Sequence, residues 1–165
     1  MFEPFPKNPF DPKKDPDRHA VWHILIAEDS LAFVASDWPR LASHFDEHDF
    51  EGIRCADSPD PDHWTLSFAR LESYRDQWLE ASKVFRTLQF KDHTPAQALL
   101  ARCSLTKIDL LGDRALAHKK FHGALLLLDG TPYAPGQRQT LYRLRKQQGA
   151  WKITGFLGRL PLITP

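Results

Sequence analysis

The sequence predicts an α+β fold in which helices come first and a curved antiparallel sheet follows. Two observations support it. Residues 17–36 and 71–86 repeat apolar side chains at helical spacing. Residues 115–157, by contrast, form long strand-like segments separated by turn signals. The closing run, residues 140–161, makes sense only as the edge of a sheet that the earlier helices cover, and 165 residues are enough for one domain with a core.

Charge and composition narrow the class of partner. Twenty-two Lys and Arg stand against 21 Asp and Glu, so the net charge is +1 and no strong field favours nucleic acid or an anionic membrane. No run reaches the roughly 18 apolar residues of a membrane span. Cys55 and Cys103 are isolated, which is typical of reduced thiols. We therefore expect a cytoplasmic protein with a small-molecule partner, and neither nucleic acid nor membrane.

The first 16 residues are expected to be an extended arm. Five of the 13 prolines fall here, and each removes a backbone donor and fixes φ, which excludes a helix or a central strand. The predicted organisation is an arm over residues 1–16 followed by a single domain over residues 17–165.

Asp17 is the predicted N-cap of a first helix that ends near Ser36. Two apolar stripes lie side by side on it, so more than half of its circumference is expected to be buried. Glu28 falls in one stripe and Asp29 in the other. An acid in an apolar stripe costs free energy unless it has a partner or a chemical task. The alternative is that both carboxylates reach solvent or an arginine at the margin of the stripe.

Two more helices and the strands complete the expected order. Asp37 caps a short helix, residues 71–86 form a third one, and residues 49–54 read as a short strand. Thr94 and Gln97 match a capping box, but the residues after them alternate, so a strand with a helical start is expected from about Leu99. The remaining strands are predicted at 115–128, 140–147 and 151–157, with a loop at 129–139 and a turn at Gln148–Gly149.

The phrases AEDSLAFVASDWPRLASHFDEHDF and QQGAWKITGF resemble the nuclear transport factor 2-like (NTF2-like) superfamily, in its SnoaL-like and scytalone dehydratase-like branch. The resemblance covers residues 17–160 and is specific for fold, not for chemistry. It implies a cone, in which a curved sheet wraps over about three N-terminal helices around an apolar cavity. It also implies a homodimer formed through the sheet.

The catalytic patterns of enzymes in this superfamily do not carry over. Ketosteroid isomerase-like members have a Tyr where this sequence has Asp29, and acids near residues 52–53 and 140–141, where this sequence has none. Scytalone dehydratase-like members use a His on the first long strand, and residues 95–112 contain none. The Arg-x-Asp of limonene epoxide hydrolase-like members has Ser104 in place of the Asp.

His118, Lys120 and His122 are the remaining acid/base candidates, because strand alternation places them on one face of a single strand. Asp29 would reach them from the first helix as a carboxylate partner. Histidine titrates near neutrality, which suits proton transfer. The alternative is that this face looks outward to solvent or to a second subunit and has no chemical role.

A set of aromatic side chains is predicted to line the cavity, with ordinary core packing as the alternative. The set comprises Trp22, Trp38, Trp64, Tyr74, Trp78 and Tyr142. The leading hypothesis is an isomerase, cyclase or dehydratase that acts on a small apolar or aromatic molecule without metal or cofactor. The alternatives are a non-catalytic binding domain and a dimerisation module.

Overall fold

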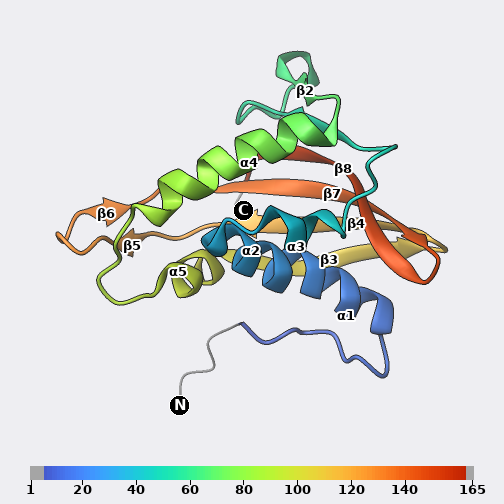
Figure 1. Cartoon of the computed structure of the whole chain (residues 1–165), viewed down its shortest axis with the longest axis horizontal. Helices are drawn as coiled ribbons and strands as arrows, with labels where there is room; N and C mark the ends of the chain where they lie inside the picture. Colours follow the sequence, from blue (N-terminus) through green and yellow to red (C-terminus); the bar gives the residue numbers. More distant parts are fainter. Residues whose placement is uncertain (1–5, 163–165) are drawn as a thin grey trace.

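The structure is a computed structural model that describes residues 6–162, and it confirms the α+β class. Helices lie across one face of a strongly curved sheet, which leaves the other face open (Figure 1). The sheet has six strands in the order β2-β1-β8-β7-β4-β3, and a small separate pair, β5-β6, projects at one end. Residues 1–5, which include part of the predicted proline arm, lie outside the described residues.

The first helix is continuous but not uniform. It consists of α1 (Pro16–Trp22), a π-helical segment η1 (His23–Glu28) and α2 (Asp29–Ala35). Its N-cap is Asp15, which accepts from the Arg18 amide, and not the predicted Asp17. The earlier start is possible because proline is tolerated in the first helical turn.

Asp17 has a different task, which is to fasten the helix to the sheet. Its Oδ1 accepts hydrogen bonds from Lys146 Nζ at 2.8 Å and from Trp151 Nε1 at 3.0 Å. Both donors belong to the hairpin of β7 (Arg138–Gln147) and β8 (Ala150–Pro161). The N-terminal turn of the first helix is thereby held against β7 and β8.

The remaining helices follow their sequence signals closely. Asp37 caps α3 (Trp38–Ala42), and α4 (Leu71–Arg86) has the predicted bounds. The capping box at Thr94 is formed, and helix α5 continues from Pro95 to Ala101. The helical start expected in this region is thus confirmed, but the strand after it begins at Cys103 and not near Leu99, because the reciprocal hydrogen bonds of the capping box stabilise the helix.

The other strands were predicted with mixed accuracy. β1 (Glu51–Arg54) lies within the predicted segment, whereas β2 (Thr65–Phe68) was not predicted. β3 (Cys103–Leu111) and β4 (Arg114–Phe121) form an antiparallel pair, and β4 pairs on its other side with β7. β1 runs parallel to β8, which is the one parallel pairing of the six-stranded sheet.

The strand predicted for residues 115–128 ends at Phe121. There the His122 amide donates to the Arg102 carbonyl, and Gly123 adopts a φ of 85°, which turns the chain away from the sheet. The residues beyond form β5 (Leu125–Leu126), which pairs with β6 (Pro132–Tyr133). The predicted loop at 129–139 is thus the tip and the return of a small hairpin.

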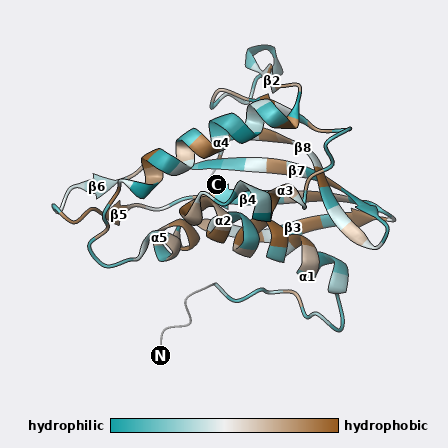
Figure 2. Ribbon diagram, in the orientation of Figure 1, coloured by the Kyte–Doolittle hydropathy of each residue, from teal (hydrophilic) through white to brown (hydrophobic). Residues whose placement is uncertain are grey.

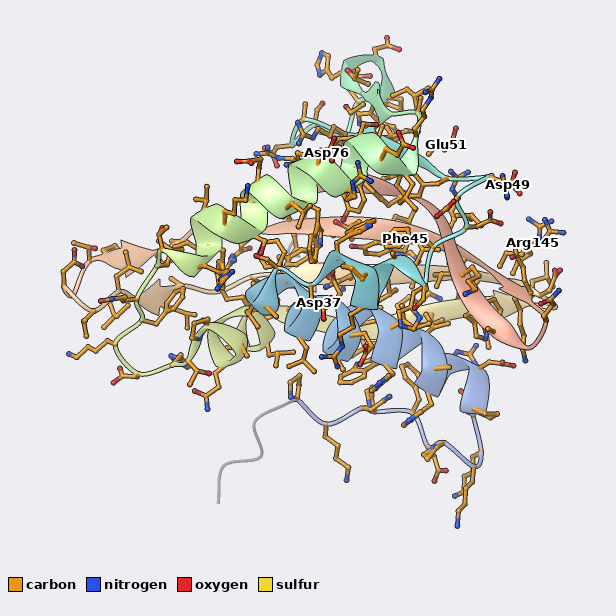
Figure 3. The ribbon with its side chains drawn as sticks, viewed as in Figure 1. Asp37, Phe45, Asp49, Glu51, Asp76 and Arg145 are labelled. Atoms are coloured by element: carbon orange, nitrogen blue, oxygen red, sulfur yellow. The ribbon has the colours of Figure 1, made fainter. Side chains whose placement is uncertain are left out.

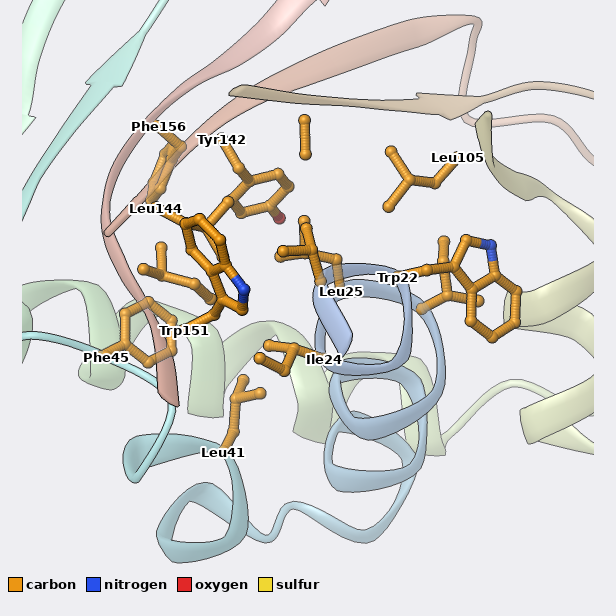
Figure 4. Close-up of a cluster of buried hydrophobic side chains, with 14 of the residues drawn as sticks. Trp22, Ile24, Leu25, Leu41, Phe45, Leu105, Tyr142, Leu144, Trp151 and Phe156 are labelled. Carbon is orange, nitrogen blue, oxygen red and sulfur yellow. The ribbon is translucent and has the colours of Figure 1, made fainter. Parts of the chain in front are cut away.

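The main core lies between the helices and the sheet (Figure 4). Much of the first helix is hydrophobic, whereas α4 alternates between hydrophilic and hydrophobic residues (Figure 2). A second cluster, centred on Phe85, Phe90 and Ala98, fills the space under β5-β6. The arm contributes Phe10, which packs against the main core. Among the described helices, none combines the length and the apolar character that a membrane crossing requires.

Close approach between β1 and β8 explains one glycine. Gly155 lies opposite Glu51 in the parallel pairing, and a Cβ built on Gly155 would stand 2.5 Å from the Glu51 carbonyl oxygen. A Cβ built on Gly158, on the same strand, would stand 3.2 Å from the Phe156 ring and 3.8 Å from the Ile53 carbonyl oxygen, which is an ordinary contact distance. A backbone atom in a sheet cannot move aside as a side chain does, so the two positions tolerate a methyl group differently.

We predict that Gly155→Ala lowers the free energy of unfolding by about 2 kcal/mol, the usual cost of overpacking. The matched variant Gly158→Ala is expected to cost less than about 1 kcal/mol, because an aromatic side chain can adjust. Urea titrations followed by circular dichroism measure both. Equal costs would contradict the close approach of β1 to β8.

Candidate functional site

The most unusual residue of the core is a lysine. Lys119 lies on the face of β4 that looks toward the helices, on the same side of the strand as Ala115, Ala117 and Phe121. Only 2% of Lys119 is exposed. Lysine is almost never buried to this degree without partners, so we expect groups that compensate its charge to lie around it.

Three groups compensate the Lys119 ammonium. Its Nζ donates to Asp29 Oδ2 at 2.7 Å and to the Leu25 carbonyl oxygen at 2.6 Å. The same nitrogen lies 5.2 Å from the centre of the Phe121 ring, within the range of a cation–π interaction. The ion pair therefore joins the first helix to the middle of the sheet, two elements that are 90 residues apart in sequence.

The π-helical segment makes the Leu25 carbonyl available. In an α-helix the Asp29 amide would donate to Leu25, four residues earlier. Here it donates to Ile24, five residues earlier, and to Ile26, three residues earlier, and not to Leu25. The Leu25 carbonyl thereby loses its regular partner, and Lys119 takes that place. Such π turns are rare and are found often at functional sites.

The Lys119 side chain is charged near neutral pH. Burial lowers the pKa of Lys119, but the Asp29 carboxylate, together with Cys103 and Tyr74, outweighs that effect and raises the pKa above its ordinary value. Lys119 thus remains an ammonium ion and cannot serve as a base. Asp29 is more accessible, since 23% of its side chain is exposed against 3% for Lys119.

Two phenols and a thiol surround the pair. Burial, together with Tyr142 and Asp29, raises the pKa of Tyr74 far above its usual range, and burial with Asp29 does the same for Tyr142. Burial likewise raises the pKa of the Cys103 thiol. All three groups are therefore protonated at neutral pH. Figure 4 shows Tyr142 reaching from the sheet toward the turn of helix that carries Leu25.

The basic residues predicted from strand alternation lie on the opposite face. Lys119 points to the helices, so His118 and Lys120 point away from them, and His122 follows the end of β4. The expected contact of Asp29 with these three side chains is not formed, because the face of β4 that looks toward the helices is the one that carries Lys119. Asp29 does reach β4, but its partner is Lys119. The sequence contained a signal for Lys119: a lone charge in the otherwise apolar series Ala115, Ala117 and Phe121.

His118 has its own environment on that outer face. It lies opposite Lys107 on β3 and Leu141 on β7. Burial lowers its pKa, with Lys107 and Lys120 acting in the same direction and Asp109 opposing them. Its Nε2 is buried without a hydrogen-bond partner among the described residues. The His122 ring meets Ser104 Oγ at 3.4 Å.

The adjacent acids Glu28 and Asp29 of the first helix have different roles. Glu28 is bound in a bidentate manner by Arg40, at 2.8 and 2.9 Å, and has His23 nearby at 3.5 Å. Glu28 is thus the acid that meets an arginine at the margin of the helix, as the alternative interpretation stated. Asp29 is the acid with an interior partner.

The aromatic side chains predicted to line a cavity mostly pack against one another. Trp22, Trp38, Trp78 and Tyr142 are buried in the main core, and Tyr74 packs against it. The centroids of Trp38 and Trp78 are 5.3 Å apart, and those of Tyr74 and Phe156 are 5.0 Å apart. Trp64 lies outside this cluster, where its Nε1 donates to the Ser58 carbonyl.

The two best-defined hollows of the described residues are not lined by the ion pair. One of about 330 Å³ lies near the β3-β4 turn and includes Leu111, Leu116 and Arg143. The other, of about 290 Å³, lies at the start of α4 beside Trp38.

Comparison with known proteins identifies the fold. No family model and no curated protein matches the sequence. Solved structures do: a cystatin-like-fold domain of unknown function from Nostoc punctiforme has a TM-score of 0.60 at 14% identity, over 90% of this chain and 79% of that one. An NTF2-like protein of unknown function from Shewanella baltica has a TM-score of 0.54 at 14% identity, over 87% and 93%.

A third neighbour, from Novosphingobium aromaticivorans, is described as a candidate aromatic ring hydroxylase. Its TM-score is 0.52 at 16% identity, and the match covers 91% of both chains. At such low identities the comparisons establish the fold alone. The chain has the NTF2-like, cystatin-like fold, as the sequence resemblance implied.

We predict that Lys119→Met lowers the free energy of unfolding by about 3 kcal/mol, because it leaves a half-buried carboxylate and a carbonyl without their donor. Lys120→Met changes the next residue of the same strand, on the open face of the sheet. It should alter the free energy of unfolding by no more than about 0.5 kcal/mol. Chemical denaturation near pH 7 measures both. Because the pKa of Lys119 is raised in the folded protein, its contribution to stability should be fully present below the ordinary lysine pKa of about 10.4 and fade as the pH rises above that value.

Proposed function

We propose that this protein binds a small, neutral, largely aromatic or apolar molecule at the Asp29–Lys119 pair, and transfers a proton to and from it. The reaction class is isomerase, cyclase or dehydratase chemistry without a redox step. The observation that carries the proposal is a half-buried carboxylate held by a buried lysine that cannot itself titrate near neutrality.

The geometry supports Asp29 as the base. Lys119 binds Oδ2, and Oδ1 has no hydrogen-bond donor among the described residues, so that oxygen is left to accept a proton. Lys119 fixes the orientation of the carboxylate, as a positioning residue does. A carboxylate fixed in this way can remove a proton from the carbon next to a carbonyl group.

The hydroxyl groups of Tyr74 and Tyr142 can stabilise the negative charge that forms on the substrate in this step. When Asp29 removes a proton, the electron pair of the broken C–H bond moves to the carbonyl oxygen and forms an enolate. Tyr74 and Tyr142 remain protonated, because their pKa values are raised, and their hydroxyls can donate to that oxygen. Return of the proton from Asp29 to another carbon completes an isomerisation, and no oxidant or cofactor is consumed.

The lining selects a neutral molecule. Around the pair the side chains are aromatic and aliphatic, including Phe121, Leu25 and Cys103. A charged substrate would lose its hydration there with little compensation, since the ammonium and carboxylate already neutralise each other. An aromatic or alicyclic ketone fits these surroundings best.

The test uses 2-tetralone, an aromatic ketone with exchangeable α-protons, in D2O. The expected result is that the protein accelerates α-proton exchange, followed by NMR, and that Asp29→Asn reduces the acceleration by at least about 100-fold, the usual contribution of a general base. Tyr142→Phe should reduce it less. Circular dichroism verifies that each variant is folded.

Asp76→Asn is the control, because Asp76 is an exposed carboxylate on α4 (Figure 3) and its loss should not alter exchange. Exchange that is equal in wild type and Asp29→Asn would refute proton transfer by Asp29. Binding of 2-tetralone in fluorescence titrations without accelerated exchange would instead leave the non-catalytic binding domain as the function.

A second copy of the chain is the proposed partner of the open sheet face. An apolar row crosses four strands there: Leu141 lies opposite Leu157, Leu157 opposite Ile53, and Ile53 opposite Leu66. The charged neighbours on this face already pair within the chain, as Arg143 does with Glu51. An apolar row with satisfied charges beside it is self-complementary about a two-fold axis.

Leu141→Glu is therefore predicted to convert a dimer into a monomer in size-exclusion chromatography with light scattering, because a charge would be buried at the centre of the row. Val84→Glu, at an exposed position of α4, should leave the dimer intact. A wild-type chain that is monomeric at about 50 μM, where a stable interface remains assembled, would contradict the interface.

The proposed compartment is the reducing cytoplasm. Both cysteines, Cys55 and Cys103, are free and buried in the structure. Free buried thiols behave as small hydrophobic side chains and are typical of proteins kept under reducing conditions. The burial of both free thiols supports this compartment.

A further inference from the structure

A second buried cation lies at the end of the molecule from which the β5-β6 hairpin projects. Arg102, between α5 and β3, is only 8% exposed. Its Nε donates to the Gly123 carbonyl and its Nη2 to the Gly136 carbonyl, both at 3.0 Å. These glycines are where the chain leaves for the hairpin and returns from it, so Arg102 holds the base of the hairpin together.

Arg102 differs from Lys119 in having no carboxylate. Among the described residues, no Asp or Glu forms an ion pair with it, although buried charges are normally paired. Its compensation consists of two carbonyls and the Tyr133 ring, whose centre is 5.7 Å from the guanidinium carbon. Burial lowers the pKa of Arg102, which reflects this incomplete compensation.

A second guanidinium converges on the same place. Arg138 Nη2 donates to the Pro135 carbonyl, and Arg102 binds the carbonyl of the next residue, Gly136. The two cations are close enough for Arg138 to contribute to the lowered pKa of Arg102. Arg138 likewise has no acidic partner within residues 6–162. Two neighbouring cations repel each other, and an anion between them would remove that cost.

Donors are left over for such an anion. A guanidinium has five N–H groups, and Arg102 uses its Nε and Nη2, so Nη1 has no acceptor in the described part of the chain. Space is also available: a Cβ on Gly123 would meet nothing within 4 Å, and one on Gly136 would meet only Arg138 Nη2, at 3.9 Å. The base of the hairpin is thus reachable from outside.

We propose that Arg102 and Arg138 form a binding site for the carboxylate group of a small aromatic acid. The free Nη1 of Arg102 and the Arg138 guanidinium can each donate a charge-assisted hydrogen bond to one oxygen of a carboxylate. Tyr133 provides an aromatic surface beside the charge. The site is separate from Asp29 and Lys119 and does not depend on the chemistry proposed there.

The test compares benzoate with benzamide, its neutral analogue of the same shape, at constant ionic strength. Benzoate is expected to shift the Nε–H resonance of Arg102 in nitrogen-15 NMR spectra and to raise the melting temperature, whereas benzamide does neither. Inorganic phosphate is expected to bind more weakly than benzoate. Because these readouts involve no proton transfer, they are independent of the 2-tetralone experiment.

Arg138→Gln carries the mutational test, since Arg102 also holds the hairpin and its loss would confound binding with folding. The variant should weaken the apparent affinity for benzoate by about tenfold, as expected for one charge-assisted hydrogen bond. Arg75→Gln removes a guanidinium that already pairs with Asp76 and should leave the affinity unchanged.

Three results would overturn the proposal. One is equal binding of benzoate and benzamide, or binding of neither, by the wild-type protein. Another is an unchanged benzoate affinity in Arg138→Gln, which would place the carboxylate elsewhere. The third is tighter binding of inorganic phosphate than of benzoate, which would contradict a carboxylate as the ligand group.

Discussion

The ion pair between Lys119 and Asp29 is the interaction on which the arrangement of the two layers depends. Each ion loses hydration when the two layers pack together, at a cost of several kcal/mol. The attraction between the two ions offsets this cost only if the partner is in place. The first helix and β4 are therefore coupled: neither can shift along the other without leaving a charge unpaired. Hydrophobic contacts alone would tolerate such a shift more easily, because they have no preferred direction.

The π-helical turn follows from the same constraint. The Lys119 ammonium has three hydrogens, and the carboxylate takes one. The carbonyl that the turn releases at Leu25 takes another, and the Phe121 ring lies over the charge. A regular α-helix would offer no such acceptor, since its interior carbonyls are already bonded. The Leu25 carbonyl in the π-helical turn and the buried ammonium group of Lys119 are thus each other's hydrogen-bond partner.

The two ends of the molecule are stabilised in different ways. At one end, Asp17 fastens the first helix to the β7-β8 hairpin, where Asp49 and Arg145 also approach each other at 3.9 Å (Figure 3). At the other end, Arg102 gathers the β5-β6 hairpin through backbone carbonyls, over a small aromatic cluster. Carboxylates compensate the cations at the first end. Carbonyls and an aromatic ring do so at the second.

The sequence by itself determined the α+β class, the caps at Asp37 and Thr94, helix α4 and the turn at Gln148–Gly149, because these depend on neighbours within a few residues. It also marked Asp29 as an acid in need of a partner. Only the tertiary structure decided that the partner is Lys119 and not His118, Lys120 or His122. Strand alternation groups residues by face, but which face is buried depends on where helices from elsewhere in the chain pack.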